Sequence, residues 1–314
     1  MNALRAIVVD PSAPARLALK EISAPTPSPS EALVRVAAFS LNLGEVRGIT
    51  TAQAGYCPGW DLSGVVEQSA ADGSGPQTGK RVVGWVRSGA WAELVAVPTQ
   101  NLAEIPEKVS FGKAATLPIA GLTALRALEK GGNLLDKKVL ITGATGGVGH
   151  LAVQLAHHAG ARVVGVARRP EGESFVLDAG AHEVVVGEQI LSASQFGPYH
   201  LIIDSVGGKV LGQALGMLAP GGTCVNFGAS EGAEVTFDLR KFFLVGGATF
   251  YGLIIFYELA RRPGAEDLAS LARMIDDGRL LPQIAIETSW TQTSEVVQKM
   301  LNREITGKAV LCIE

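Results

Sequence analysis

The chain has 314 residues, of which 47% are hydrophobic and 18% are charged, and its formal net charge is −3. Length and composition are typical of a globular protein with two domain cores, and they exclude the disordered and fibrous classes. The basic residues are scattered except for short pairs, so we predict no nucleic-acid partner. No run reaches the roughly 18 apolar residues of a membrane span, and the amino terminus has no secretory pattern, so we predict a cytoplasmic protein without membrane contact.

Residues 1–113 carry short apolar runs separated by Pro, Gly and Ser, which is typical of the strands of an all-β unit. Within them, "PGWDLSG" places Trp60 and Asp61 between two glycines. The stretch could be a metal site, a catalytic acid or a turn that begins a strand. We favour an Asp61 carboxylate that accepts backbone N–H groups within its own turn. Trp60 would pack beneath a cleft or line an acceptor pocket.

From residue 114 the pattern changes. Apolar spacing predicts a helix over 114–128 that ends at Gly131-Gly132, and strands and helices then alternate to about residue 283. Such alternation predicts an α/β doubly wound parallel sheet. The last strand, helix and strand are expected to fold back onto the amino-terminal unit. The predicted domains are therefore 1–113 with 284–314, and 114–283.

A glycine-rich turn lies inside "VLITGATGGVGHLAVQLA", after a predicted strand and before a predicted helix. Gly146 and Gly149 occupy the second and third positions of a GxGxxG fingerprint, and Ala144 occupies the first. Such glycines let the backbone approach a pyrophosphate, which the helix N-terminus attracts. We predict a dinucleotide site at Thr145, Gly146, Gly147 and Val148. The alternative is a structural turn.

The end of the next strand predicts which dinucleotide binds. The chain there reads Ala167, Arg168, Arg169, and the first acid, Glu171, follows a proline. Arginine suits a 2′-phosphate, whereas an NAD site has an acid for the ribose hydroxyl. We predict NADPH as the cofactor, unless the arginines are only a solvated pair. The loop also fits TGxxxGxG of short-chain dehydrogenases, but no YxxxK occurs and the loop lies too far along the chain for that family.

Several ordered motifs resemble the medium-chain dehydrogenase/reductase superfamily, and within it the zinc-free quinone oxidoreductases. They include "PGWDLSGVV", "AATLPIAGLTALRAL", "GATGGVGHLAVQLA", "LIIDSVGG", "APGGTCVNFG" and "GKAVL". The resemblance covers nearly the whole chain. It implies a GroES-like β-barrel catalytic domain, a Rossmann domain, a cleft between them and a homodimer joined through the sheet edges.

The resemblance also bears on zinc. In the zinc-dependent relatives a cysteine stands at the position of Asn42, a His-Glu pair at that of Trp60-Asp61, and a cysteine or acid near Ile119. Asn, Trp and Ile do not make a tetrahedral zinc site. The three cysteines form no CxxC pair and the histidines no HExxH spacing, so we predict no metal.

The implied activity is hydride transfer from NADPH to a quinone or an α,β-unsaturated carbonyl, with a water proton completing the reduction. By resemblance, Asn42 faces the nicotinamide and the substrate, Thr123 lines the nicotinamide pocket, and the cofactor is bordered by Val206, Asn226, Phe227 and Gly228. Tyr56 would offer a hydrogen bond or a flat wall to the substrate. Asn42 as a helix cap and Tyr56 as a surface aromatic are the alternatives. A rival function is an NADPH-binding protein with little turnover, acting as a redox sensor or in a structural or binding role.

Overall fold

A computed structural model describes residues 4–314. By its internal contacts the chain forms two compact units: unit 1 holds the described residues up to Leu122 together with Leu259–Glu314, and unit 2 holds Thr123–Glu258. The predicted domain boundaries were drawn at 113 and 284 instead. Residues 114–122 and 259–283 group with unit 1 because α9 (Ala265–Asp276) contacts a π-helix over Leu117–Gly121 and strand β7 (Leu102–Glu104).

Unit 1 is built on a mostly antiparallel sheet of short strands. Its order is β14-β15-β3-β4-β5-β7, and β6 pairs with β3; only β14 and β15 run parallel. A two-stranded sheet, β1-β2, completes the β structure among the described residues. The strands are β1 Leu4–Val9, β2 Leu17–Ile22, β3 Glu31–Ser40, β4 Asp61–Gln68, β5 Arg81–Trp85, β6 Leu94–Pro98, β7 Leu102–Glu104, β14 Ile284–Ser289 and β15 Lys308–Cys312.

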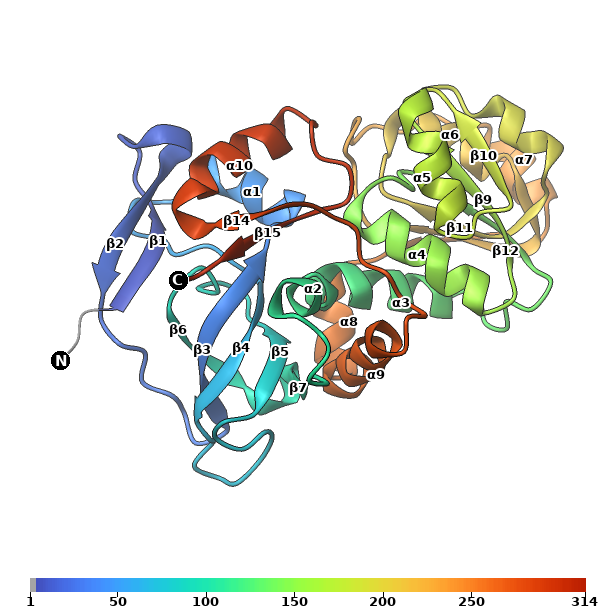
Figure 1. The fold of residues 1–314 in the computed structure, drawn as a ribbon. Coiled ribbons are helices and arrows are strands. Elements are labelled where there is room, and N and C mark those ends of the chain that lie inside the picture. Colours follow the sequence, from blue (N-terminus) through green and yellow to red (C-terminus); the bar gives the residue numbers. More distant parts are fainter. Residues whose placement is uncertain (1–3) are drawn as a thin grey trace. The chain divides into compact units, whose positions relative to one another are not determined.

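The end of the chain returns to the beginning of unit 1. Strand β15 pairs antiparallel with β3, with Val310 opposite Ser40, and β14 lies outside it. Figure 1 shows these red strands beside the blue β3. The expectation that the last elements fold back onto the amino-terminal unit is confirmed. The remaining helices of this unit are α1 Leu43–Ile49, α2 Phe111–Ala115 and α10 Thr293–Leu301.

The helix predicted over 114–128 is divided into three parts. Helix α2 ends at Ala115, a π-helix covers Leu117–Gly121, and α3 (Leu122–Glu129) follows. Pro118 stands at the start of the π-helix, and the Ile119 N–H donates to the side chain of Asp61 rather than to a helix carbonyl. A single turn of π-helix is a common device where a helix serves a site.

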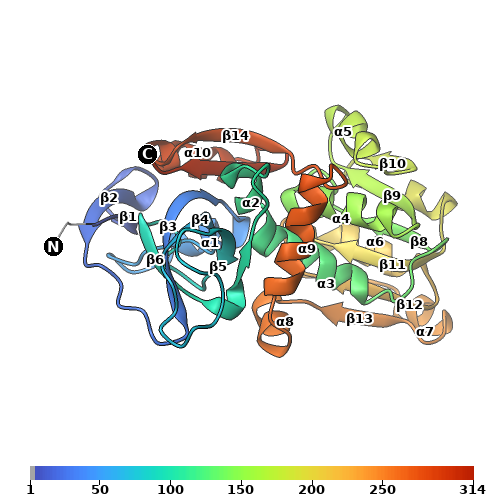
Figure 2. The same cartoon turned by 60° about the horizontal axis from the view of Figure 1, so that its bottom comes forward.

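Unit 2 holds the predicted parallel sheet. Its order is β10-β9-β8-β11-β12-β13, and every neighbouring pair is parallel, which confirms the α/β fold class. Figure 2 shows β10 and β13 at the two edges of this sheet. The strands are β8 Lys138–Ile141, β9 Arg162–Ala167, β10 Glu183–Val186, β11 Tyr199–Asp204, β12 Leu218–Asn226 and β13 Thr249–Gly252. The helices are α4 Gly147–His158, α5 Glu173–Asp178, α6 Gly208–Leu215 and α7 Leu239–Leu244; α8, Ile255–Arg261, spans the boundary between the units.

The strand order creates a switch point between β8 and β11. From β8 the chain moves outward to β9 and β10, then returns to β11 and moves the other way to β13. Because crossovers are right-handed, α4 and α5 cover one face of the sheet and α6 covers the other. A crevice therefore opens at the carboxyl ends of β8 and β11, where doubly wound folds bind nucleotides. Among the described residues no helix is long and apolar enough to cross a membrane.

Candidate functional site

The glycine-rich loop after β8 makes the tight turn that its sequence predicts. Gly143 has a φ of +60°, and the buried Ala144 donates its N–H to the Val166 carbonyl of β9 at 3.1 Å. Alanine is tolerated at the first fingerprint position because the left-handed residue of this turn is the preceding glycine. A Cβ on Gly149 would lie 2.2 Å from the Gly143 carbonyl oxygen. Glycine is thus required for α4 to begin so close to the turn.

The start of α4 presents backbone donors at the edge of the sheet. Its N-cap, Gly146, has extended backbone with φ −84° and ψ 167°, and no side chain caps it. First-turn N–H groups have no acceptor within a helix, and the helix dipole adds positive potential. Thr145, Gly147 and Val148 are half-buried alongside Gly146, so this segment reaches the surface. These residues, 145–148, form a cradle of backbone N–H groups that fits the pyrophosphate of a dinucleotide.

The two predicted arginines follow β9, the strand next to β8. The Arg168 side chain is 33% exposed, and its Nη1 lies 3.7 Å from Glu231 Oε1. Arg169 is exposed and precedes a 3₁₀ helix over Pro170–Gly172. Both stand at the same sheet edge as the glycine loop, at the strand end where a doubly wound fold holds the adenosine ribose.

A buried acid ties together the strand ends that carry the other predicted cofactor residues. Asp204, fully buried at the end of β11, accepts hydrogen bonds from Thr142 Oγ1 at 2.6 Å and from Asn226 Nδ2 at 2.7 Å. It also accepts the Gly207 N–H at 3.0 Å. The Asp204 carbonyl oxygen accepts the Phe227 N–H at 3.0 Å. The carboxyl edges of β8, β11 and β12 are therefore fixed by one carboxylate.

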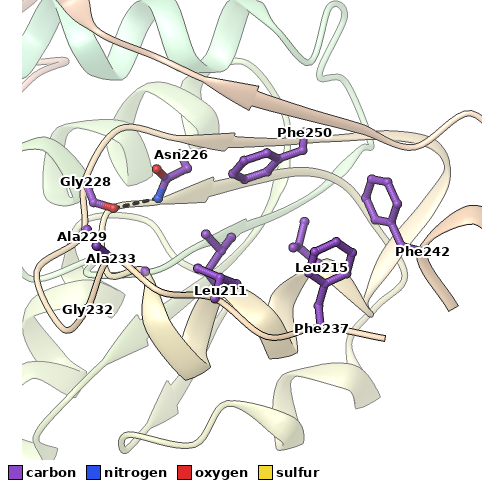
Figure 3. A pocket seen from close by; sticks show the side chains of 12 residues that line it. Leu211, Leu215, Asn226, Gly228, Ala229, Gly232, Ala233, Phe237, Phe242 and Phe250 are labelled. Atoms are coloured by element: carbon purple, nitrogen blue, oxygen red, sulfur yellow. Dashed lines mark hydrogen bonds between the residues drawn. The ribbon is translucent and has the colours of Figure 1, made fainter. Parts of the chain in front are cut away.

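A pocket of about 420 Å³ opens beside this network (Figure 3). Asn226 and Gly228 stand at its rim, and the Asn226 amide nitrogen donates to the Gly228 carbonyl at 2.7 Å. Apolar side chains from α6, α7, β13 and the segment after β12 make the rest of the lining, among them Leu211, Leu215, Phe237, Phe242 and Phe250. Two of the predicted cofactor residues, Asn226 and Gly228, thus lie beside this pocket. Val206 is half-buried after β11, and Thr123 is buried on α3.

In unit 1, Asn42 and Asp61 meet in a buried cluster of polar side chains. Asp61 is fully buried and accepts Ser40 Oγ and Asn42 Nδ2 on Oδ2, both at 2.7 Å. The Ile119 N–H donates to Asp61 Oδ1 at 2.9 Å. The prediction that Asp61 accepts N–H groups of its own turn is therefore wrong, because its backbone donor comes from the distant π-helix and its other donors are side chains.

Lys308 brings a buried positive charge to this cluster. Its Nζ donates to Asn42 Oδ1 at 2.8 Å and to the Leu41 carbonyl at 2.9 Å, and lies 3.6 Å from Asp61 Oδ2. Both ends of the Asn42 amide are thus engaged, the oxygen by Lys308 and the nitrogen by Asp61. This arrangement fixes the amide in one orientation, and the Asn42 Nδ2 also lies 3.4 Å from Glu45 Oε1, so both of its protons have acceptors within the cluster.

Glu45 is the second buried acid of the cluster. Asn42 is the N-cap of α1, and its backbone N–H donates to Glu45 Oε1 at 2.7 Å. Burial, and secondly the nearby Asp61 charge, raise the pKa of Glu45 well above its ordinary value. Burial also lowers the pKa of Lys308, against the opposing influence of Asp61 and Glu45. Asn42 is therefore both a helix cap, as its alternative interpretation held, and the centre of a polar cluster.

Tyr56 lies at the surface near this cluster. It is 41% exposed, and its pKa is raised, first by partial burial and then by the charge of Glu45, while a hydrogen bond with Ser88 opposes the shift. Trp60 is half-buried and its ring lies against Gly44, where an added Cβ would be 2.9 Å from Cη2. Tyr56 thus has an accessible phenol, and Trp60 packs on the first turn of α1.

The positions that hold zinc in related enzymes do not fit the metal here. Asn42 is committed to Lys308 and Asp61, Trp60 offers an indole, and Ile119 contributes only its backbone N–H. An ammonium group already lies beside the Asp61 carboxylate. Among residues 4–314, no group of three or more His, Cys, Asp or Glu side chains is arranged to hold a metal ion.

Sequence reasoning missed three of the residues that organise these sites. Glu45 stands three positions after Asn42, which is the spacing of a capping box and was a usable signal. Lys308 begins a strand whose other residues are mostly apolar and buried. A lysine in such a strand indicates a buried ammonium group that needs an acidic or polar partner. Asp204 ends a buried strand, but nothing local indicates that it joins three strand ends.

Comparisons with known proteins agree with this geometry. Residues 28–107 match the family described as "Alcohol dehydrogenase GroES-like domain", and residues 147–273 match "Zinc-binding dehydrogenase". The chain is 28% identical over 307 residues to the quinone oxidoreductase of Pongo abelii, covering 93% of this chain and 92% of that protein. It is 30% identical over 240 residues to YhfP of Bacillus subtilis (strain 168), covering 73% and 71%.

The fold comparison gives the same answer. The structure of the quinone oxidoreductase from Coxiella burnetii superposes with a TM-score of 0.83 at 25% identity, over 100% of both chains. The chain belongs to the medium-chain dehydrogenase/reductase superfamily and is similar to its quinone oxidoreductases, which confirms the resemblance stated from the motifs. It is an oxidoreductase of this superfamily, whose members bind a nicotinamide cofactor.

Proposed function

We propose that the protein is a zinc-independent oxidoreductase that transfers a hydride from NADPH to a quinone or an α,β-unsaturated carbonyl. The observation that carries this proposal is the combination of two features: a glycine cradle at the N-terminus of α4, and a pair of arginines at the end of the neighbouring strand β9. The similarity of the chain to quinone oxidoreductases over more than nine-tenths of its length supports a quinone or a related conjugated compound as the acceptor.

The described residues at the zinc positions of related enzymes are not zinc ligands, and this restricts the substrates that the protein can reduce. Where related enzymes bind the metal, a network of hydrogen bonds and an ion pair joins Lys308, Asn42 and Asp61. Without a Lewis acid to polarise an alcohol or an isolated carbonyl, a conjugated acceptor is the suitable substrate, because conjugation spreads the incoming negative charge onto an oxygen. NADPH supplies the hydride when bound.

The chain's own residues then bind and orient the reactants. The N–H groups at Gly147 and Val148 bind the pyrophosphate, and Arg168 and Arg169 bind the 2′-phosphate. The role proposed for Asn42 is a contact to the nicotinamide and the substrate, made by an amide that Lys308 and Asp61 hold in one orientation. Tyr56, which is 41% exposed, offers a hydrogen bond or a flat surface to the acceptor, and water supplies the final proton.

We further propose that the protein is a homodimer and that it works in the cytoplasm. Strand β13 is the last strand of its sheet, and its outer edge has no partner strand among the described residues. Exposed apolar side chains lie on β13 and on the segments just before and after it in the chain: Leu239, Phe243, Leu244, Phe250, Ile254 and Tyr257. An open edge strand within an apolar patch is typical of a subunit interface. Sedimentation of the protein would test this, since a monomer at micromolar concentration contradicts it.

The activity is tested by mixing the purified protein with NADPH and a panel of quinones and enals. We expect the absorbance of the reduced nicotinamide to fall with at least one acceptor. Tight binding of NADPH with no oxidation across the panel would instead favour the rival function, a cofactor-binding protein with little turnover. Zinc independence predicts that dialysis against a chelator leaves the rate unchanged.

The cofactor assignment has a separate test. Replacing Arg168 and Arg169 together with alanine should weaken binding of NADPH by about tenfold or more, because two charge-assisted contacts to phosphate are lost. Binding of NADH should change little. Dissociation constants measured by cofactor fluorescence decide this, and an equal loss for both cofactors would contradict the 2′-phosphate assignment.

A further inference from the structure

The contact between Arg168 and Glu231 crosses the crevice of unit 2. Arg168 follows β9, and the backbone of Glu231 is bound beside the end of β11. Strand β8 lies between those two strands. With about 4.8 Å between neighbouring strands, the pair spans roughly 10 Å of the sheet edge. It therefore passes over the carboxyl end of β8, from which the glycine loop begins.

Glu231 is held in place by its backbone. Its N–H donates to the Val206 carbonyl at 2.8 Å, and the Ser230 N–H donates to the Ser205 carbonyl at 3.2 Å. On the other side, the Gly208 N–H donates to the Gly232 carbonyl at 3.1 Å. A Cβ on Gly207 would lie 2.4 Å from that carbonyl, so glycine permits this close approach. The segment is thus a short ladder fixed to the end of β11, and it keeps the carboxylate over the crevice.

The ion pair is loose enough to be exchanged. Its N–O distance is 3.7 Å, and the two side chains are 33% and 29% exposed. Exposed pairs of this kind contribute little stability. A phosphate monoester carries a larger charge than a carboxylate and offers more acceptor oxygens, so it binds a guanidinium more strongly. Arg168 can therefore leave Glu231 for a 2′-phosphate, but the carboxylate competes with that phosphate.

We propose that Glu231 is a specificity-determining residue, which pairs with Arg168 and so reduces the preference of the protein for NADPH over NADH. The inference rests on the proposed function, because it takes Arg168 as the partner of the 2′-phosphate. NADH has a ribose hydroxyl at that position and does not compete for the guanidinium, so Glu231 lowers the affinity for NADPH alone.

The test measures dissociation constants of NADPH and NADH by cofactor fluorescence, without an acceptor and at low ionic strength. Glu231→Gln should tighten NADPH by about two- to fivefold, the range of an exposed ion pair, and change NADH less than about twofold. Glu234→Gln is the matched control, since Glu234 lies on the same segment, is exposed and carries the same charge. It should leave both constants unchanged. Raising the salt concentration should shrink the gain of Glu231→Gln.

A double-mutant comparison separates the competing explanations. In an Arg168→Ala background, Glu231→Gln should no longer tighten the binding of NADPH, because the guanidinium for which Glu231 and the 2′-phosphate compete is absent. The inference is overturned if Glu231→Gln behaves like Glu234→Gln, or if its gain persists undiminished without Arg168, which would show direct repulsion of the phosphate. Failure of the NADPH proposal itself has a different signature: Arg168→Ala would weaken NADPH and NADH equally.

Discussion

The two units build their sites in opposite ways. In unit 1, Asn42, Glu45, Asp61 and Lys308 come from three segments of the chain, are largely buried and satisfy one another. In unit 2, the proposed nucleotide edge uses the backbone of one continuous loop, and of its two arginines Arg169 is exposed and Arg168 is half-buried. Substitutions in the first site should therefore mainly lower the free energy of unfolding. Substitutions in the second site should mainly weaken ligand binding.

The largest expected effect is on the buried ion pair of unit 1. Lys308→Met leaves the Asp61 carboxylate buried without its cation and should lower the free energy of unfolding by about 3–5 kcal/mol. The control is Lys299→Met, which removes the exposed pair of Lys299 with Glu295 on α10 and should cost less than about 1 kcal/mol. Urea denaturation of both variants measures the difference. Similar losses would show that the cluster contributes no more than a surface pair.

The glycine loop of unit 2 should respond in binding as well as in stability. In Gly149→Ala the new Cβ meets the Gly143 carbonyl oxygen at 2.2 Å, so α4 or the turn must shift. We expect a loss of about 1–3 kcal/mol in unfolding free energy and a loss of NADPH affinity of about tenfold or more. Gly216→Ala is the control, because Gly216 has a φ of −74° and meets only an ordinary contact at 3.4 Å. If both variants bind NADPH equally, the cradle does not hold the pyrophosphate.

The difference between the units also explains what the sequence could predict. The nucleotide loop is local: strand, turn and helix follow one another within about 30 residues, and the fingerprint defines their spacing. The parallel, doubly wound character of the sheet followed from the alternation of strands and helices. Gly143, which adopts the left-handed conformation, lies just before the position where the fingerprint places its first glycine. The local pattern therefore predicted the cradle although one of its glycines was absent.

The cluster in unit 1 could not be derived in that way. Lys308 and Asn42 are separated by 266 residues, and only the pairing of β15 with β3 brings them together. Asp61 was singled out from its turn, but its donors come from β3, the N-cap of α1 and the π-helix, none of which that turn specifies. Long-range burial of charge depends on the tertiary fold, so sequence patterns indicate the acid without its partners.

Titration of Glu45 offers a third test of the buried cluster. Because burial raises its pKa above the ordinary value of 4.5, the folded protein holds this proton to higher pH than the unfolded chain does. The stability that comes from the protonated form is therefore full below pH 4.5 and is lost as the pH rises towards the folded pKa. Relative to Glu45→Gln, the wild-type unfolding free energy should fall by up to about 1.4 kcal/mol per pH unit in that window. A difference between the two proteins that does not change with pH would contradict the raised pKa.

The smallest expected effect concerns Tyr56, the exposed part of the site in unit 1. Tyr56→Phe removes a hydroxyl from a side chain that is 41% exposed, so the unfolding free energy should change by less than about 1 kcal/mol. If the phenol contacts the acceptor, KM for the quinone should rise by about two- to tenfold, the value of one hydrogen bond, while the dissociation constant of NADPH stays the same. Equal kinetics for wild type and Tyr56→Phe would make Tyr56 a surface aromatic, which is its alternative interpretation.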